Sequence, residues 1–152
     1  MFPSITGSNL ERRRFDLPGD FEGDLNLVII AFQMFHQNWI DAWAPYLKPM
    51  LAEVPEVPLY ELPVLDHFDP IRRWMIDGGM RAGIPDRATR AATITLYTDK
   101  RVFRQALSIP DESSIHLLLV DRQGAIHARV EGRYSAEKLA TLAEGLRKHA
   151  LV

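Results

Sequence analysis

The sequence predicts an α/β fold, a three-layer α/β/α sandwich around a central mixed sheet of about five strands. Strand-like apolar runs alternate with helical patterns over the first two thirds of the chain, and crossover helices of this kind join parallel strands. The last third instead holds two strand-like runs separated by a short turn, which predicts an antiparallel hairpin, and then a helix. We treat residues 1–152 as one domain, because this length suits one hydrophobic core.

The first part of the chain predicts a lead-in, a buried strand and a kinked helix. Residues 1–25 contain several turn-forming glycines and prolines and are expected to be irregular or a hairpin. Residues 26–33 form a short apolar run typical of a strand that is covered on both faces. Residues 38–52 show apolar residues at helical spacing, and Pro45 within them predicts a kink.

The middle of the chain predicts two strands, each followed by a helix. Residues 59–65 are expected to be a strand that is short or at an edge, because Pro63 cannot donate a ladder hydrogen bond. Residues 69–82 have an amphipathic helical pattern. Residues 92–97 alternate with β-branched side chains and predict the third strand, and residues 100–107 a short helix.

The last third has the clearest pattern. Residues 114–121 and 125–130 read as two strands joined by a tight turn. Ser135 is a favourable N-cap for a final helix. The apolar stripe expected on that helix consists of Leu139, Leu142, Ala143 and Leu146.

Composition narrows the possible partners and reactions. The formal net charge is −2, so no global field favours nucleic acid or an anionic membrane. The chain has no run long and apolar enough to span a bilayer, and its first residues lack the pattern of a signal peptide. We therefore expect a cytoplasmic protein without membrane insertion, nucleic-acid partner or cofactor. The chain contains no cysteine, which excludes disulfides and thiolate metal sites.

The segment Asn26–Leu47 resembles the first strand and active-site helix of the thioredoxin-like superfamily, specifically its peroxiredoxin-like branch of thiol–disulfide oxidoreductases. In that pattern an apolar strand ends in Phe, a Cys-x-x-Cys motif follows, and a proline stands five residues past the second Cys. Here Phe32 matches the strand phenylalanine and Pro45 the helix proline, so Gln37-Asn38-Trp39-Ile40 occupies the Cys-x-x-Cys positions. The resemblance also implies that Leu17–Gly23 is the turn of an N-terminal hairpin.

A second resemblance lies in the C-terminal part of the chain. Leu117–Ile126, followed by Glu131-Gly132 and a helix, is similar to the superfamily's hairpin of an apolar strand, Asp-x-x-Gly-x-Ile and a trailing glycine. The family places a cis-proline just before that strand, where this chain has Ile115. The run Leu118–Gly132 also resembles part of the C-terminal portion of the assembly factors of the mitochondrial ATP synthase. These factors look like thioredoxin-fold domains that act in a chaperone-like way.

The resemblance implies a fold whose usual chemistry this chain cannot perform, because a thiolate is the nucleophile in disulfide exchange and thiol peroxidase reactions. We expect a redox-inactive domain, without catalytic residues, that binds a protein or peptide partner as an assembly or chaperone-like module. Homo-oligomers remain possible. The implied binding surface is the former active site, comprising His36, Gln37, Asn38, Trp39, Ile40, Ser114 and Ile115.

Two other functions stay open at this point. The chain could be an oxidoreductase or antioxidant protein that works through a partner's thiols or through His36 and Gln37. It could also carry a small molecule in a pocket behind the first helix. His36 could serve as a general base, although a surface or capping histidine is the plainer interpretation.

The remaining candidate residues each have a structural interpretation as well. Gln37 and Asn38 could hold an anion at the helix N-terminus, or Asn38 could simply be the N-cap. Trp39 and Trp43 could form an exposed platform or belong to the core, and we expect Trp39 to be partly exposed. Asp66–Asp69 could suggest a metal site but more simply forms a loop with a helix cap, so we predict no metal. Arg12–Arg14 is expected to be a solvated turn.

Overall fold

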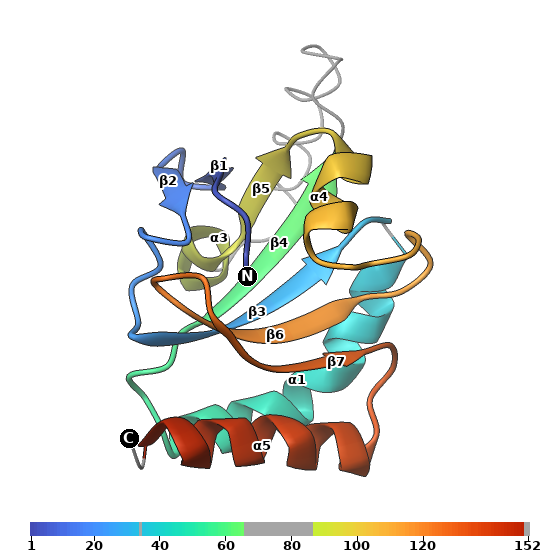
Figure 1. The fold of residues 1–152 in the computed structure, drawn as a ribbon. Coiled ribbons are helices and arrows are strands. Elements are labelled where there is room, and N and C mark those ends of the chain that lie inside the picture. Colours follow the sequence, from blue (N-terminus) through green and yellow to red (C-terminus); the bar gives the residue numbers. More distant parts are fainter. Residues whose placement is uncertain (34, 66–86, 151–152) are drawn as a thin grey trace.

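The computed structural model of the chain describes residues 1–33, 35–65 and 87–150 (Figure 1). The helix predicted over 69–82 and the Asp66–Asp69 segment lie outside these residues. The five predicted strands are present, but the sheet has seven strands rather than about five, in the order β2-β1-β5-β4-β3-β6-β7. The strands are β1 (Ile5–Asn9), β2 (Arg14–Leu17), β3 (Leu25–Ala31), β4 (Leu59–Leu65), β5 (Ile94–Tyr97), β6 (His116–Asp121) and β7 (Ile126–Glu131).

The sheet is mixed, as predicted. Strand β4 runs parallel to both of its neighbours, β3 and β5. Strands β6 and β7 form the predicted antiparallel hairpin beside β3. At its turn the Asp121 carboxylate accepts from the backbone N–H groups of Gln123 and Ala125, and Gly124 adopts a φ of 90°. Glycine suits that position because a side chain disfavours a left-handed conformation.

The two additional strands form a hairpin in the N-terminal segment. Its turn lies at residues 10–13, so the prediction of a hairpin turn at Leu17–Gly23 is wrong. The Asn9 side chain closes the turn by accepting from the backbone N–H groups of Glu11 and Arg13. Short side chains that bind the backbone two residues on are typical turn formers. Arg12 and Arg13 are exposed in this turn.

A close approach of backbones joins this hairpin to the rest of the sheet. Strand β1 pairs antiparallel with β5 at Ser8 and Asn9. A Cβ added at Gly7 would lie 2.6 Å from Leu96 Cδ2 and 2.9 Å from the carbonyl oxygen of Thr95. Residue 7 therefore needs to be glycine for β1 to sit against β5.

The prediction that the Pro63 strand is short or at an edge is wrong. Strand β4 has seven residues and lies between β3 and β5 near the middle of the sheet. Pro63 lies opposite Ala31, the last residue of β3. The pairing of β3 with β4 therefore ends at the residue that has no backbone N–H to donate. The next residue, Val64, pairs with Leu96 on the other side.

Helices cover both faces of the sheet (Figure 1). The long helices α1 (His36–Ala52) and α5 (Ala136–Ala150) lie on one face. Helix α4 (Lys100–Ala106) lies on the other face, together with the N-terminal segment. The short helix α3 (Arg87–Ala92) precedes β5. Helix α1 contains Pro45 and Pro49 and bends along its length, in agreement with the predicted kink. Ser135 caps α5 by accepting from the backbone N–H of Lys138.

The sheet separates two apolar clusters. The first contains Phe15, Phe21 and Phe103 together with the even-numbered side of β4. The second contains Ile40, Trp43 and Leu47 of α1 and Leu142 and Leu146 of α5. None of the helices in the described part of the chain is long and apolar enough to span a membrane.

Candidate functional site at the start of helix α1

The positions that the resemblance assigns to an active site lie where β3 leads into α1. Ile40, at the position of the second family cysteine, is 5% exposed, and Ile115, at the cis-proline position, is 0% exposed. Both side chains belong to the same apolar cluster. The cis peptide bond in the described residues is Leu17-Pro18 rather than one at Ile115. Aliphatic packing thus fills the places that the family gives to a sulfur atom and a proline.

The predicted cap of α1 is wrong. The helix begins at His36, two residues earlier than expected, with Phe35 as N-cap and no side-chain capping bond. Asn38 therefore lies inside the helix, where it is exposed. The N–H of His36 binds the Gln33 carbonyl and that of Asn38 binds the Phe35 carbonyl. Two of the N–H groups that could have held an anion are therefore already bonded within the protein.

His36 is expected from the sequence to be a surface or capping histidine; it is buried, and its ring binds backbone N–H groups before the helix instead of capping α1. It is 0% exposed, and its Nδ1 accepts from the backbone N–H groups of Phe32 at 3.2 Å and Gln33 at 3.3 Å. The imidazole side chain thus closes the turn between β3 and α1. Because Nδ1 accepts, the neutral ring carries its proton on Nε2.

The environment of the ring keeps it neutral. Burial lowers the pKa of His36, and the backbone of Ser113 partly opposes that shift. Nε2 makes no well-aligned hydrogen bond within the described residues. A general base needs a free acceptor nitrogen that reaches a substrate, and the acceptor nitrogen here faces two backbone donors. His36 is therefore a structural group in this arrangement.

Ser113 approaches His36 in space, and Ser114 follows it in the chain. The backbone of Ser113 lies near the imidazole. However, the hydroxyl of Ser113 donates to Asp111 Oδ1 at 2.5 Å, and that of Ser114 donates to the carbonyl of Ile115 at 3.3 Å. Among the described residues neither hydroxyl is hydrogen-bonded to His36, so no nucleophile–base pair forms.

Gln37 lies on the exposed side of α1. Its amide donates to Asp41 Oδ1 at 3.0 Å, a bond within the helix. Burial raises the pKa of Glu61 on β4, and the charge of Asp41 adds to that shift. Gln37 is thus linked to a carboxylate of its own helix and makes no described contact with His36.

An aromatic surface covers the start of α1, and we define it as Phe35, Trp39 and Arg133. Phe35 is 54% exposed and meets Trp39 edge-on, with ring centroids 5.9 Å apart. Trp39 is half-buried, as expected, and the guanidinium of Arg133 lies 5.0 Å from its ring centroid. This distance is in the range of a cation–π contact. The aromatic surface therefore has an apolar centre and a cationic rim.

Trp43 belongs to the core and not to this surface. It is 0% exposed, and its Nε1 donates to the carbonyl of Gly132 at 3.0 Å. Tyr134 meets Trp43 edge-on and stacks on Tyr46 at a centroid separation of 3.7 Å. These contacts fix the connection between β7 and α5, which carries Arg133.

The structure places the seven predicted site residues in two layers. Gln37 and Asn38 are exposed, Trp39 and Ser114 are half-buried, and His36, Ile40 and Ile115 are buried. Sequence reasoning missed Phe35 and Arg133. Phe35 directly precedes the helix, and its large apolar side chain beside the proposed site could have marked it as a candidate. No local signal places Arg133 over Trp39, because 94 positions separate them in the chain.

No group of three side chains suited to binding a metal occurs among residues 1–33, 35–65 and 87–149. The predicted lack of a metal site at Asp66–Asp69 lies outside the described residues and stays a prediction.

Comparison with solved structures shows that the fold is thioredoxin-like. The exposed lipoprotein thioredoxin of Streptococcus pneumoniae strain TIGR4 is 10% identical, with a TM-score of 0.63 over 96% of this chain and 99% of that one. The thioredoxin domain of a Bacteroides vulgatus thiol-disulfide oxidoreductase is 20% identical, with a TM-score of 0.59 over 95% and 94%.

A secreted disulfide oxidoreductase of Mycobacterium tuberculosis is 16% identical, with a TM-score of 0.54 over 95% of this chain and 96% of that one. At these identities the similarity shows the fold alone. No protein-family model matches this chain, and no curated protein matches it either. Its similarity is thus to thioredoxin-like thiol–disulfide oxidoreductases, and this chain contains no cysteine.

Mild acidification is expected to destabilise the fold through the two buried histidines. Burial lowers the pKa of both His36 and His116 from the ordinary value of 6.5. At mildly acidic pH the unfolded chain therefore binds more protons than the folded one. The stability that the two neutral histidines contribute is complete above the unfolded pKa and is lost as the pH falls through the folded pKa. The free energy of unfolding in urea should decrease between about pH 7.5 and about pH 5.5.

A double variant identifies the source of this dependence. In His36→Gln/His116→Gln the decrease should be much smaller, whereas His149→Gln, near the end of α5, should behave like the wild type. If the double variant keeps the full pH dependence, the two buried histidines are not its cause.

Proposed function

We propose that this protein is a redox-inactive thioredoxin-like domain of the peroxiredoxin-like branch that binds a polypeptide through the aromatic surface. The observation that carries the proposal is the exposed Phe35 beside Trp39 and Arg133, with Trp39 packed against the apolar cluster that contains Ile40 and Ile115. A few residues carry most of the binding energy at protein interfaces, and tryptophan and arginine are enriched among them.

The chemistry of the site supports binding over catalysis. This chain contains no thiol, and the acceptor nitrogen of His36 is already bonded to the backbone. The similarity of Leu118–Gly132 to assembly factors of the mitochondrial ATP synthase suggests the kind of work, the holding of a partly folded protein during assembly. We propose that this work takes place in the cytoplasm.

The aggregation of insulin tests both the binding and the redox part of this proposal. When dithiothreitol reduces insulin, its B chain precipitates, and light scattering follows the process. The wild-type protein should slow this precipitation, and Phe35→Ala/Trp39→Ala should lose most of the effect because it removes both exposed rings. At dithiothreitol concentrations that reduce insulin only slowly, the protein should not accelerate insulin reduction, and with dithiothreitol as reductant it should not increase the consumption of hydrogen peroxide.

A control variant separates the aromatic surface from exposed apolar residues in general. Val102 is 60% exposed on α4 and lies outside the surface, so Val102→Ala should protect like the wild type. Equal protection by wild type and the double variant would refute the assignment of the surface. Insulin reduction or peroxide turnover by the purified protein would instead favour the alternative, an oxidoreductase or antioxidant protein that acts through groups other than cysteine.

A further inference from the structure

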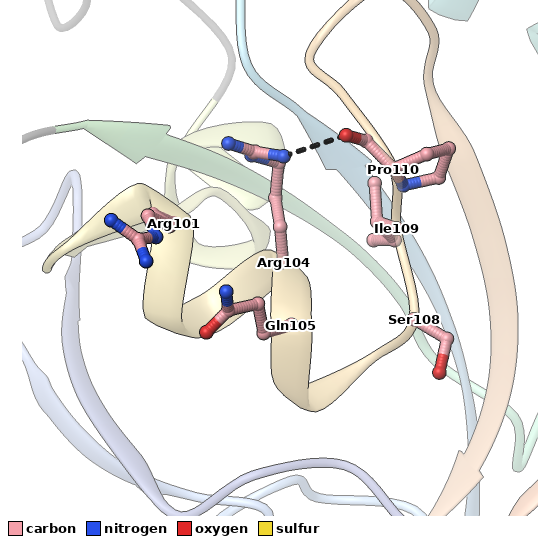
Figure 2. A pocket seen from close by; sticks show the side chains of 6 residues that line it. All are labelled: Arg101, Arg104, Gln105, Ser108, Ile109 and Pro110. Atoms are coloured by element: carbon pink, nitrogen blue, oxygen red, sulfur yellow. Dashed lines mark hydrogen bonds between the residues drawn. The ribbon is translucent and has the colours of Figure 1, made fainter.

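A second candidate site lies on the opposite face of the sheet, beside helix α4. It is an open cavity of about 450 Å³ between the helix and the chain that follows it (Figure 2). We call it the arginine pocket, and its lining residues are Arg101, Arg104, Gln105, Ser108, Ile109 and Pro110.

Local sequence and a tight turn build this pocket. Arg101, Arg104 and Gln105 are three and four residues apart and so lie on one side of α4. Phe103 on the other side is buried in the core. Ser108 adopts a left-handed φ of 56°, and the N–H of Ile109 binds the carbonyl of Arg104. This helix ending folds the chain back along the arginine side chains.

Neither guanidinium of the pocket has an acidic partner among the described residues. Arg104 donates from Nη1 to the carbonyl of Pro110 at 2.9 Å, while its Nε is buried and without an acceptor (Figure 2). Arg101 is exposed, and no described residue accepts a hydrogen bond from its side chain. Buried donors are normally satisfied, and a partly buried charge is stabilised by an opposite one.

Asp111, the acidic residue that follows Pro110, does not form an ion pair with either arginine. Hydrogen bonds from the Ser113 hydroxyl and N–H lower the pKa of Asp111, with a smaller contribution from the charge of Arg104. Asp111 forms no ion pair with Arg101 or Arg104 within the described residues. The neighbouring Lys100, by contrast, is paired with Glu112 at 2.9 Å. Within the part of the chain that the structure describes, the two guanidinium groups of the pocket thus have no ion pair with a carboxylate.

We propose that the arginine pocket binds an oxyanion, and that this oxyanion is a carboxylate side chain of the bound polypeptide. Two guanidinium groups offer charge-assisted hydrogen bonds to carboxylate oxygens. The apolar ring of Pro110 can pack against the stem of such a side chain. The polypeptide part of the proposal rests on the proposed function; the oxyanion part does not.

The position of the pocket relative to the aromatic surface defines the partner further. Pro110 is three residues before Ser113, whose backbone lies near His36, and three extended residues span at most about 11 Å. The chain that lines the pocket thus continues toward the start of α1, and we infer that one partner segment contacts both sites. The partner should present an acidic residue a few positions from an apolar one.

Titrations followed by NMR test the pocket directly, with inorganic phosphate and N-acetylglutamate as probes at constant ionic strength. Both probes should produce saturable shifts of the Gln105 and Ser108 amide signals. Arg104→Gln should weaken the binding of N-acetylglutamate by about tenfold or more. If Arg104→Gln does not fold, Arg101→Gln replaces it. This variant removes an exposed guanidinium that donates no hydrogen bond to a described residue, and it should also weaken the binding of N-acetylglutamate. Arg147→Gln, an equal charge change on α5, should bind like the wild type.

The outcomes separate this proposal from the proposed function. Absence of saturable shifts, or an equal loss in Arg147→Gln, would overturn the pocket as an oxyanion site. Strong binding of phosphate without binding of N-acetylglutamate would overturn the carboxylate as its ligand. Phe35→Ala/Trp39→Ala should bind N-acetylglutamate normally, so a failure of the aromatic surface would leave the oxyanion site intact.

Discussion

Replacement of Trp43 by alanine is expected to lower the free energy of unfolding by about 3–5 kcal/mol. Trp43 is 0% exposed, lies among apolar residues of α1 and α5, and donates from Nε1 to the carbonyl of Gly132. Alanine leaves a large cavity and a carbonyl group without its donor. Since small domains are stable by only about 5–15 kcal/mol, urea unfolding should show the variant close to the limit of folding.

Two variants divide this loss into its causes. Trp43→Phe keeps most of the ring volume but removes the N–H donor, so it should cost much less than alanine. Tyr46→Ala removes an exposed ring that stacks on Tyr134 and should cost less still. A Trp43→Ala protein within about 1 kcal/mol of the wild type would show that this contact does not hold α1 to the β7–α5 connection.

Replacement of Asn26 by alanine should be the second large loss, roughly 2–4 kcal/mol. Asn26 is 0% exposed. Its Oδ1 accepts from the N–H of Gly23 at 2.9 Å, and its Nδ2 donates to the carbonyls of Gly23 at 2.9 Å and Val120 at 3.2 Å. These bonds attach the turn before β3 to β6, and alanine leaves both backbone groups of Gly23 buried without this partner.

The aspartate variant gives a sharper form of this test. Asn26→Asp has the same shape, but a carboxylate oxygen would face the carbonyls of Gly23 and Val120, whereas a protonated carboxyl can donate to one of them. Its destabilisation in urea should therefore shrink as the pH is lowered. Asn38→Ala, an exposed position on α1, is the matched control and should change stability by no more than about 0.5 kcal/mol. Equal losses in Asn26→Ala and Asn38→Ala would contradict the assigned role.

Predictions from local patterns succeeded where neighbouring residues decide the conformation. The Asp121–Gly124 turn, the Ser135 cap and the kink at Pro45 each depend on a few consecutive residues, and the structure confirms them. The predicted turn at Leu17–Gly23 failed because the Asn9 side chain closes a turn earlier in the chain. Asn38 failed as a cap because His36 holds the end of β3 and starts the helix sooner.

The candidate site could be located from the sequence, but its composition could not. The register of Phe32 and Pro45 pointed to the start of α1. The contact between Trp39 and Arg133 joins different elements, and no periodic pattern in the sequence indicates it. The arginine pocket is built from residues 101–110, and sequence reasoning overlooked it. The central place of Pro63 was missed for a similar reason, because strand order follows from the packing of the whole sheet.

The sequence by itself determined the succession of strands and helices, since their periods reflect how side chains alternate along a backbone. It also determined that this chain has no thiol to react. Only the tertiary structure decided that His36 is buried, which lowers its pKa, and that Arg133 lies over Trp39. Burial and charge pairing depend on residues far apart in the chain, and folding alone brings these together.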